Sequence, residues 1–291
     1  MKFSFLTYQF CRFPLKRCFE IARRYGFEGV EVWGARPHAY AYDMNQHRIA
    51  ELNQWKKDNH VEISMYTPEI LAYPYSLTSS LPEEYNDTIH YLEKCLEVAA
   101  GIGTTNMQVT CPHPGYGVNM DEVYSRVVEA FQTLSLKAEK LGVTIVMEAL
   151  SPSEGNLLTT AYDLKKIIKN VGNPYFKGML DVVPPVIANE PIASYFEELG
   201  NNMAYIHICN SDEKTEFHSQ LDTGCIPMID LFQIFQNYHY DGWCSLELLA
   251  PYFKDPELYL AQSARIIHNI CEELSITRSP LKESCSCITI K

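Results

Sequence analysis

The chain has 291 residues, 46% of them hydrophobic, which suits a single (β/α)8 barrel with a large core. Its 36 acidic residues outnumber 24 basic ones, and the resulting formal net charge of −12 disfavours nucleic-acid binding. No apolar run is long enough for a membrane span, and the first residues lack the apolar core of a secretion signal. We therefore expect a cytoplasmic protein that works without a membrane and without nucleic acid.

Apolar, β-branched segments alternate with amphipathic segments along the chain. The expected strands span residues 3–7, 29–33, 61–66, 106–111, 143–150, 176–182, 203–209 and 243–249. The expected helices span residues 14–25, 46–59, a long segment from about 82, 121–141, 161–171, 191–199, 228–240 and 256–274. Ser80 and Glu83 form a capping-box pattern before the third helix.

These eight strand–helix pairs follow one another without a linker. Strict alternation predicts a parallel sheet with crossover helices, and eight units predict an α/β fold that closes into a TIM barrel. An open doubly wound sheet is the alternative, but no G-x-G-x-x-G motif follows the first strand. We expect one barrel domain over residues 1–274 and a polar C-terminal tail over 275–291, with Cys285 and Cys287 in the tail.

Four strand ends carry residues that can bind a metal ion. Glu148, Asp181, His207 and Glu247 each follow an apolar segment, at the ends of the fifth to eighth strands. Functional groups of TIM barrels lie at this end, and three carboxylates meeting there would repel one another without a cation. The set predicts one divalent ion, Mn²⁺, Mg²⁺ or Co²⁺, with positions left for substrate oxygens. Each residue taken alone is also compatible with a satisfied polar group at a strand end.

At these residues the sequence resembles the sugar phosphate isomerase/epimerase superfamily, the xylose isomerase-like TIM barrels, and the four residues match that family's metal ligands. Further segments resemble those of fructoselysine 3-epimerases: EVWGARPHAY (31–40), YTPE (66–69), YPY (73–75), HPGY (113–116) and SYFEELG (194–200). The resemblance covers roughly residues 3 to 272. It implies a metal-dependent isomerase or epimerase that acts on a sugar.

The chain departs from the tagatose-type ketose 3-epimerases at three places. Those enzymes have a His three residues after the Asp ligand, where this chain has Pro184, and an Arg six residues after the His ligand, where it has Glu213. Many members also have P-G-x-G after a second His, whereas His218 is followed by LDTG at 221–224. These differences indicate a substrate other than a free ketose.

Eight further residues in or beside the loops after the strands are candidate substrate contacts. They are Trp33, Arg36, His38, Tyr66, Glu69, His113, Glu154 and His218. An Arg in such a loop can clamp a carboxylate or phosphate, and Glu69 can bind hydroxyls or an ammonium. The resemblance implies that Glu154 contacts substrate hydroxyls. For the others, solvation at the surface or packing at the rim is the competing interpretation.

The metal and the paired glutamates together favour epimerisation next to a carbonyl. A metal on the carbonyl oxygen stabilises an enediolate, and two carboxylates on opposite faces can remove and return the proton. Glu148 and Glu247 form the natural pair, and Asp181 and His207 would be ligands only. We expect C3 epimerisation of a ketose or of a ketosamine such as fructoselysine.

Other functions are compatible with the same parts. An aldose–ketose isomerase or a dehydratase of a sugar-derived substrate would use the same metal and carboxylates. An endonuclease IV-like DNA-repair enzyme would need three metals, more His ligands and a basic face, which the charge of −12 disfavours. A non-catalytic sugar-binding barrel is a further alternative. We also expect the chain to form a homo-oligomer.

Overall fold

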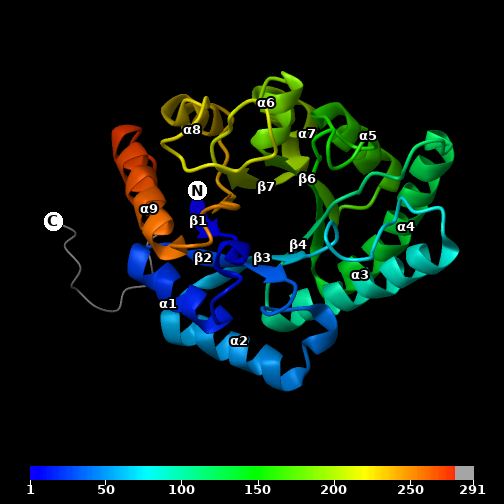
Figure 1. Ribbon diagram of the computed structural model, residues 1–291, viewed down its shortest axis with the longest axis horizontal. Helices are drawn as coiled ribbons and strands as arrows, with labels where there is room; N and C mark the ends of the chain where they lie inside the picture. The colour runs from blue at the N-terminus through cyan, green and yellow to red at the C-terminus, as the bar shows by residue number, and fades with distance from the viewer. Residues whose placement is uncertain (279–291) are drawn as a thin grey trace.

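The computed structural model describes residues 1–278, and residues 279–291, with Cys285 and Cys287, lie outside the described part. Eight parallel strands form a barrel surrounded by helices (Figure 1). The strands are β1 (Lys2–Phe5), β2 (Gly29–Gly34), β3 (Glu62–Pro68), β4 (Asn106–Val109), β5 (Thr144–Met147), β6 (Phe176–Asp181), β7 (Met203–Ile208) and β8 (Trp243–Leu246). The helices are α1 (Leu15–Tyr25), α2 (Gln46–Asn59), α3 (Pro82–Ile102), α4 (Met120–Leu141), α5 (Ala161–Val171), α6 (Val183–Ala188), α7 (Ala193–Leu199), α8 (Met228–Asn237) and α9 (Pro256–Glu273). Short 3-10 turns lie at η1 (Thr7–Phe10), η2 (Ala41–Asp43) and η3 (Gly200–Asn202).

The strand order confirms the predicted TIM barrel. Hydrogen-bonded neighbours run β1-β8-β7-β6-β5-β4-β3-β2, and all of these pairs are parallel. A parallel bridge joins Leu6, directly after β1, to Glu31 in the middle of β2, so the sheet is nearly closed. Parallel strands point the same way, so the loops after all eight strands gather at one mouth.

The local sequence explains how β5 is placed between its two helices. Helix α4 ends at Gly142, whose φ of 68° is left-handed, a conformation that glycine adopts without strain. Helix α5 begins with a capping box in which Thr160 and Asp163 satisfy each other's backbone N–H groups. These two ends fix β5 and the loop that carries Glu148 and Glu154.

Two local expectations were wrong. Ser80 and Glu83 do not form the capping box, because Leu81 is the N-cap of α3 and no side chain caps it. The hydroxyl of Ser79 instead accepts from the Leu81 N–H at 3.1 Å and donates to Glu84. In addition, β5 and β8 end at Met147 and Leu246, earlier than expected, so Glu148 and Glu247 come directly after their strands.

The hydrophobic core lies mainly between the barrel and the surrounding helices. A smaller cluster fills the barrel interior and consists of Met65, Val146, Met179 and Tyr205. These side chains close the barrel interior below the mouth, and the polar groups above this cluster form the candidate site.

Within residues 1–278, no helix is both long enough and apolar enough to cross a membrane.

Candidate metal centre and barrel mouth

The four predicted ligands meet at the barrel mouth. Ligand atoms of Glu148, Asp181, His207 and Glu247 all lie within 4.8 Å of one another. The Nδ1 atom of His207 is 2.7 Å from a Glu247 oxygen, 3.2 Å from one of Glu148 and 3.9 Å from one of Asp181. His207 is fully buried, and the side chain of Glu247 is only 14% exposed. Residues from four adjacent strands therefore converge on one small region that has little exposure to solvent.

The electrostatics of this cluster fit a divalent cation. Burial, with a smaller contribution from the neighbouring Asp181 and Glu247, raises the pKa of Glu148 to about 7 against the lowering effect of His207. Burial alone would lower the pKa of His207, but Glu31 and Glu247 raise it well above its usual value. The buried Nδ1 of His207 also has no hydrogen-bond partner of suitable geometry. A cation among these atoms would bind Nδ1 and neutralise the carboxylates, and O₃N donors suit such an ion.

A buried carboxylate holds the other side of the His207 ring. Glu31 on β2 is completely buried, and its two oxygens lie 3.0 and 3.1 Å from Nε2 of His207. Thr67 donates to one of them at 2.5 Å, and the Tyr205 hydroxyl lies 3.1 Å from the other. Burial would raise the pKa of Glu31, but His207 and the hydroxyl donors lower it. Glu31 therefore directs Nδ1 of His207 towards the cluster, as carboxylates behind metal-bound histidines do.

Two more groups hold the carboxylate ligands. The side-chain amide of Gln108 on β4 donates to Oε2 of Glu148, which leaves Oε1 facing His207. The backbone N–H of Val183 at the start of α6 donates to Oδ1 of Asp181 at 2.8 Å. Glu148 and Asp181 thus each have one oxygen fixed by a protein N–H group, and the other oxygen belongs to the cluster around His207.

His218 lies beside the cluster rather than across the mouth from it. Its Nε2 is 2.8 Å from Oδ2 of Asp181 and 3.5 Å from a Glu247 oxygen, and its Nδ1 is 2.9 Å from the Glu216 carbonyl. Burial would lower the pKa of His218, but Asp181 and Glu247 raise it to about 10. Asp181, Cys209 and His218 form a second, overlapping group of potential ligand atoms.

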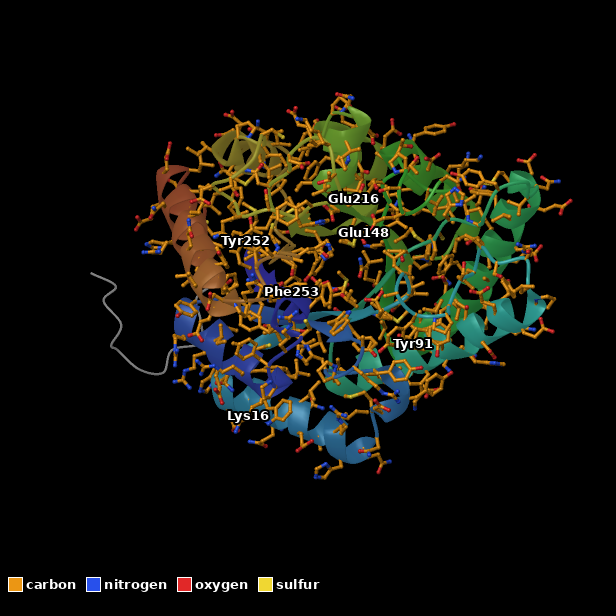
Figure 2. All side chains as sticks on the ribbon, viewed as in Figure 1. Lys16, Tyr91, Glu148, Glu216, Tyr252 and Phe253 are labelled. Atoms are coloured by element: carbon orange, nitrogen blue, oxygen red, sulfur yellow. The ribbon has the colours of Figure 1, made fainter. Side chains whose placement is uncertain are left out.

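A second pair of carboxylates borders the cluster. Glu154, in the loop after β5, contacts Glu216, in the loop after β7, and both side chains are partly buried. Burial, together with the negative charges of Glu216 and Glu148, raises the pKa of Glu154 to about 8. Glu216 was not among the predicted residues. Figure 2 shows Glu148 and Glu216 in the same region of the molecule, near β6 and β7.

The opposite side of the mouth is aromatic. Trp33, at the end of β2, packs on Tyr8 at a ring distance of 4.6 Å, and Tyr8 contacts Phe253 at 5.0 Å. The indole N–H of Trp33 donates to Glu69 at 3.0 Å, and the other Glu69 oxygen accepts the Ala72 N–H at 3.0 Å. Figure 2 shows Phe253 close to the middle of the view.

Four other predicted contacts form hydrogen bonds within the protein in this structure. Arg36 is exposed and makes two hydrogen bonds to Asp43, at 2.6 and 2.8 Å. His38 is buried with its ring nitrogens near the Thr7 hydroxyl and backbone carbonyls, and the buried Tyr66 donates to the Ala39 carbonyl at 2.7 Å. The backbone N–H of His113 donates to the Glu154 carbonyl, and the ring Nδ1 of His113 accepts a hydrogen bond from the backbone N–H of Gly115. Their roles towards a substrate remain predictions.

The functional residues that sequence reasoning missed carry a recognisable signal. Glu31 and Gln108 interrupt the apolar strands β2 and β4, just as Glu148 and His207 follow or interrupt β5 and β7. The same test applied to all eight strands would have selected both. Glu216 lies in a long polar loop and has no such signal.

Comparisons of the sequence and of the structure with known proteins agree on one family. The family model described as "Xylose isomerase-like TIM barrel" matches residues 19–270. Fructoselysine 3-epimerase from Escherichia coli O157:H7 is 28% identical over 263 residues, which cover 90% of this chain and 96% of that protein. The structure of D-psicose 3-epimerase from Clostridium cellulolyticum H10 has a TM-score of 0.79 at 16% identity and covers 94% of this chain and 99% of its own. That of 3-keto-D-glucoside 4-epimerase from E. coli has a TM-score of 0.78 at 17% identity, with coverages of 92% and 99%. The chain belongs to the xylose isomerase-like TIM barrel family.

Proposed function

We propose that this protein is a divalent-metal-dependent sugar epimerase that inverts C3 of a ketose or ketosamine. The observation that carries the proposal is the approach of Glu148 and Glu247 from two different strands to one buried cluster with Asp181 and His207. The relative named fructoselysine 3-epimerase, which aligns over 90% of this chain, supports the choice of reaction and of substrate class.

The residues that would hold the metal are the same four. Glu148, Asp181, His207 and Glu247 offer three carboxylates and one imidazole, a set that suits Mn²⁺, Co²⁺ or Mg²⁺. When bound, such an ion supplies Lewis-acid stabilisation of negative charge on substrate oxygens. Glu31 and Gln108 keep His207 and Glu148 in the orientation that this binding needs.

The proton transfers fall to Glu148 and Glu247. Epimerisation at C3 breaks a weakly acidic C–H bond and then re-forms it on the opposite face of the same carbon. One carboxylate accepts the proton as a general base, and the other donates a proton from the far side as a general acid. Both side chains approach Nδ1 of His207, at 3.2 and 2.7 Å, from β5 and β8, so a substrate seated over the cluster would have a carboxylate on each side. Burial keeps competing water away from both groups.

The aromatic side of the mouth supplies shape rather than acid or base. Tyr8, Trp33 and Phe253 contact one another at tilted and edge-on angles and form a continuous wall, and aromatic rings pack against the C–H faces of sugars. The wall comes from the loops after β1 and β8 and from the end of β2, across the barrel from the ends of β5 and β6. A substrate in the mouth would therefore lie between an apolar face and a charged one.

The test is proton NMR in D₂O with metal-loaded protein and four candidate substrates: fructoselysine, fructose, tagatose and psicose. We expect deuterium at C3, with formation of the C3 epimer, and we expect a chelator to abolish both. Deuterium at C1 of a free ketose would instead show an aldose–ketose isomerase. Formation of an enoate would show a dehydratase. Full activity in protein verified to be metal-free would refute the metal requirement.

A further inference from the structure

Glu154 and Glu216 form a pair of carboxylates at the edge of the proposed active site. The pair lies next to Glu148, whose negative charge acts on Glu154. Glu216 is connected to the same region through His218, whose ring bonds both the Glu216 carbonyl and the Asp181 carboxylate. A group bound between Glu154 and Glu216 would therefore be adjacent to a substrate bound over the metal cluster.

The backbone around the pair is well fixed. The Glu154 N–H donates to the Ser151 carbonyl at 3.1 Å, and the Glu154 carbonyl accepts from His113 at 3.0 Å. The Ser153 hydroxyl donates to Oε1 of Glu216 at 3.2 Å. The two loops that meet here are thus joined by hydrogen bonds, and the two carboxyl groups are held close enough to form a hydrogen bond with each other.

The pair lacks a cation of its own. Among residues 1–278, no lysine or arginine forms an ion pair with Glu154 or Glu216, and the positive group that acts on both is His218, which already bonds Asp181. Oε2 of Glu216 is buried and has no hydrogen-bond partner. Burying carboxylates without a compensating partner is costly, so this arrangement favours a cationic ligand.

Glu69, the other carboxylate considered for an ammonium, differs in this respect. Both of its oxygens accept hydrogen bonds, from the Trp33 indole and from the Ala72 N–H. Glu69 therefore has its oxygens occupied by neutral donors of the protein. Oε2 of Glu216 has no hydrogen-bond partner, and the carboxyl group of Glu154 lies beside Glu216.

We infer that Glu216, together with Glu154, determines specificity by binding a protonated amine of the substrate, so that the site selects an aminated ketose over a neutral one. This inference rests on the proposed function for the position of the sugar. An ammonium has three N–H donors and can bond both carboxylates at once, whereas a hydroxyl brings one donor and no charge. Glu216 would act on binding and would not take part in the proton transfers.

The experiment compares two ligands that differ in one group, 1-amino-1-deoxyfructose and fructose. Their affinities for Mn²⁺-loaded protein are measured by titration calorimetry for the wild type and for Glu216→Gln, Glu154→Gln and Asp212→Asn. Asp212 is the matched control, because it is an exposed carboxylate of the same loop that accepts hydrogen bonds from the backbone of Lys214 and Thr215. Thermal unfolding and metal content verify that each variant is folded and loaded.

We expect wild type to prefer the amine, and Glu216→Gln to weaken amine binding by roughly 10- to 100-fold, as for loss of a hydrogen bond between charged groups. Binding of fructose should change by less than about 3-fold, and Asp212→Asn should behave as wild type for both ligands. Glu154→Gln should also lose the preference for the amine.

Three results would overturn the inference: no preference for the amine in wild type, an equal loss of both ligands in Glu216→Gln, or a fall in bound metal from two ions to one in that variant. The last would mean that the pair holds a metal. Selective amine binding without C3 exchange would refute the proposed function and leave the role of Glu216 intact. C3 exchange without a preference for the amine would support the proposed function and refute the role of Glu216.

Discussion

The two halves of the barrel mouth satisfy their polar groups in different ways. On the β5–β8 side, Glu148, Asp181 and Glu247 surround Nδ1 of His207, and apart from the two histidines, His207 and His218, no cationic side chain among residues 1–278 forms an ion pair with these carboxylates. On the β1–β3 side, the carboxylates of Glu31 and Glu69 accept hydrogen bonds from the protein on both oxygens.

The difference separates chemistry from support. Unsatisfied buried charge is destabilising, and a fold tolerates it where binding of a cation or substrate compensates it. The β5–β8 half therefore holds the groups that would change partner during a reaction. The β1–β3 half holds groups whose partners are fixed, and these would orient ligands and shape the cavity. Substitutions in the two halves should consequently differ in kind as well as in size.

The largest effect is expected from Glu148→Gln and Glu247→Gln. Each removes a proton-transferring group, which costs about 10²–10⁴-fold in kcat, and each also removes a metal ligand. We expect turnover of the C3 epimerisation substrate to be abolished while circular dichroism and the unfolding midpoint show a folded protein.

Glu62→Gln is the control for these two variants. Glu62 is an exposed glutamate at the start of β3, at the other end of the barrel, where it pairs with Lys2. A surface ion pair of this kind contributes little to stability, so the turnover rate of Glu62→Gln should equal that of the wild type. Near-wild-type rates for Glu148→Gln or Glu247→Gln would contradict the assignment of the catalytic pair.

Glu31→Gln tests whether the supporting half acts through orientation. Loss of the carboxylate behind a metal-bound histidine typically lowers metal affinity by about 10- to 100-fold. We expect a loss of that size in Mn²⁺ affinity by calorimetry, with kcat recovering when the variant is saturated with metal.

The matched control is Glu28→Gln, which alters another buried glutamate of the same chain segment, next to the start of β2. Glu28 binds the Phe3 N–H and Arg278, far from the mouth, so its loss should lower thermal stability without changing metal affinity. If Glu28→Gln and Glu31→Gln changed metal affinity equally, Glu31 would have a general structural role and no specific one towards His207.

Much of this arrangement was predictable from the sequence, for a physical reason. A Glu, Asp or His that follows or interrupts an apolar strand must lie at a strand end or in a barrel interior, and the parallel order brings such ends together. Glu148, Asp181, His207 and Glu247 were found in this way, and in the structure their ligand atoms lie within 4.8 Å of one another. The contact of Glu216 with Glu154 could not be found, because it depends on how two irregular loops fold against each other. The pairing of Arg36 with Asp43 was missed for the same reason.

The pH dependence of metal binding gives a smaller effect that is specific to the charged half. Burial would lower the pKa of His207, but Glu31 and Glu247 raise it well above its usual value, and burial raises that of Glu148 to about 7. Both groups therefore hold protons in the metal-free protein in mildly acidic solution, and a metal ion must displace them. Affinity should rise with pH through neutrality, by roughly tenfold per pH unit for each proton displaced.

Calorimetry with Mn²⁺ in two buffers of different ionisation enthalpy measures both the affinity and the number of protons released. We expect at least one proton released per ion, and fewer in Glu148→Gln than in the wild type. An affinity that stayed constant between about pH 6 and pH 8 would contradict this account of the cluster.

Trp33→Phe should produce the smallest effect. The substitution keeps an aromatic ring beside Tyr8 and removes the indole N–H that donates to Glu69 at 3.0 Å. Glu69 keeps its bond from the Ala72 N–H and can turn towards solvent, so the loss should be about that of one hydrogen bond, roughly 0.5–1.5 kcal/mol. Because the wall shapes binding and takes no part in proton transfer, the loss should appear as an increase of a few-fold in KM with kcat nearly unchanged. Steady-state kinetics over a range of substrate concentrations separates the two parameters. A fall in kcat as large as that of Glu148→Gln would show that the aromatic half also takes part in the chemical step, and the division between the two halves of the mouth would no longer hold.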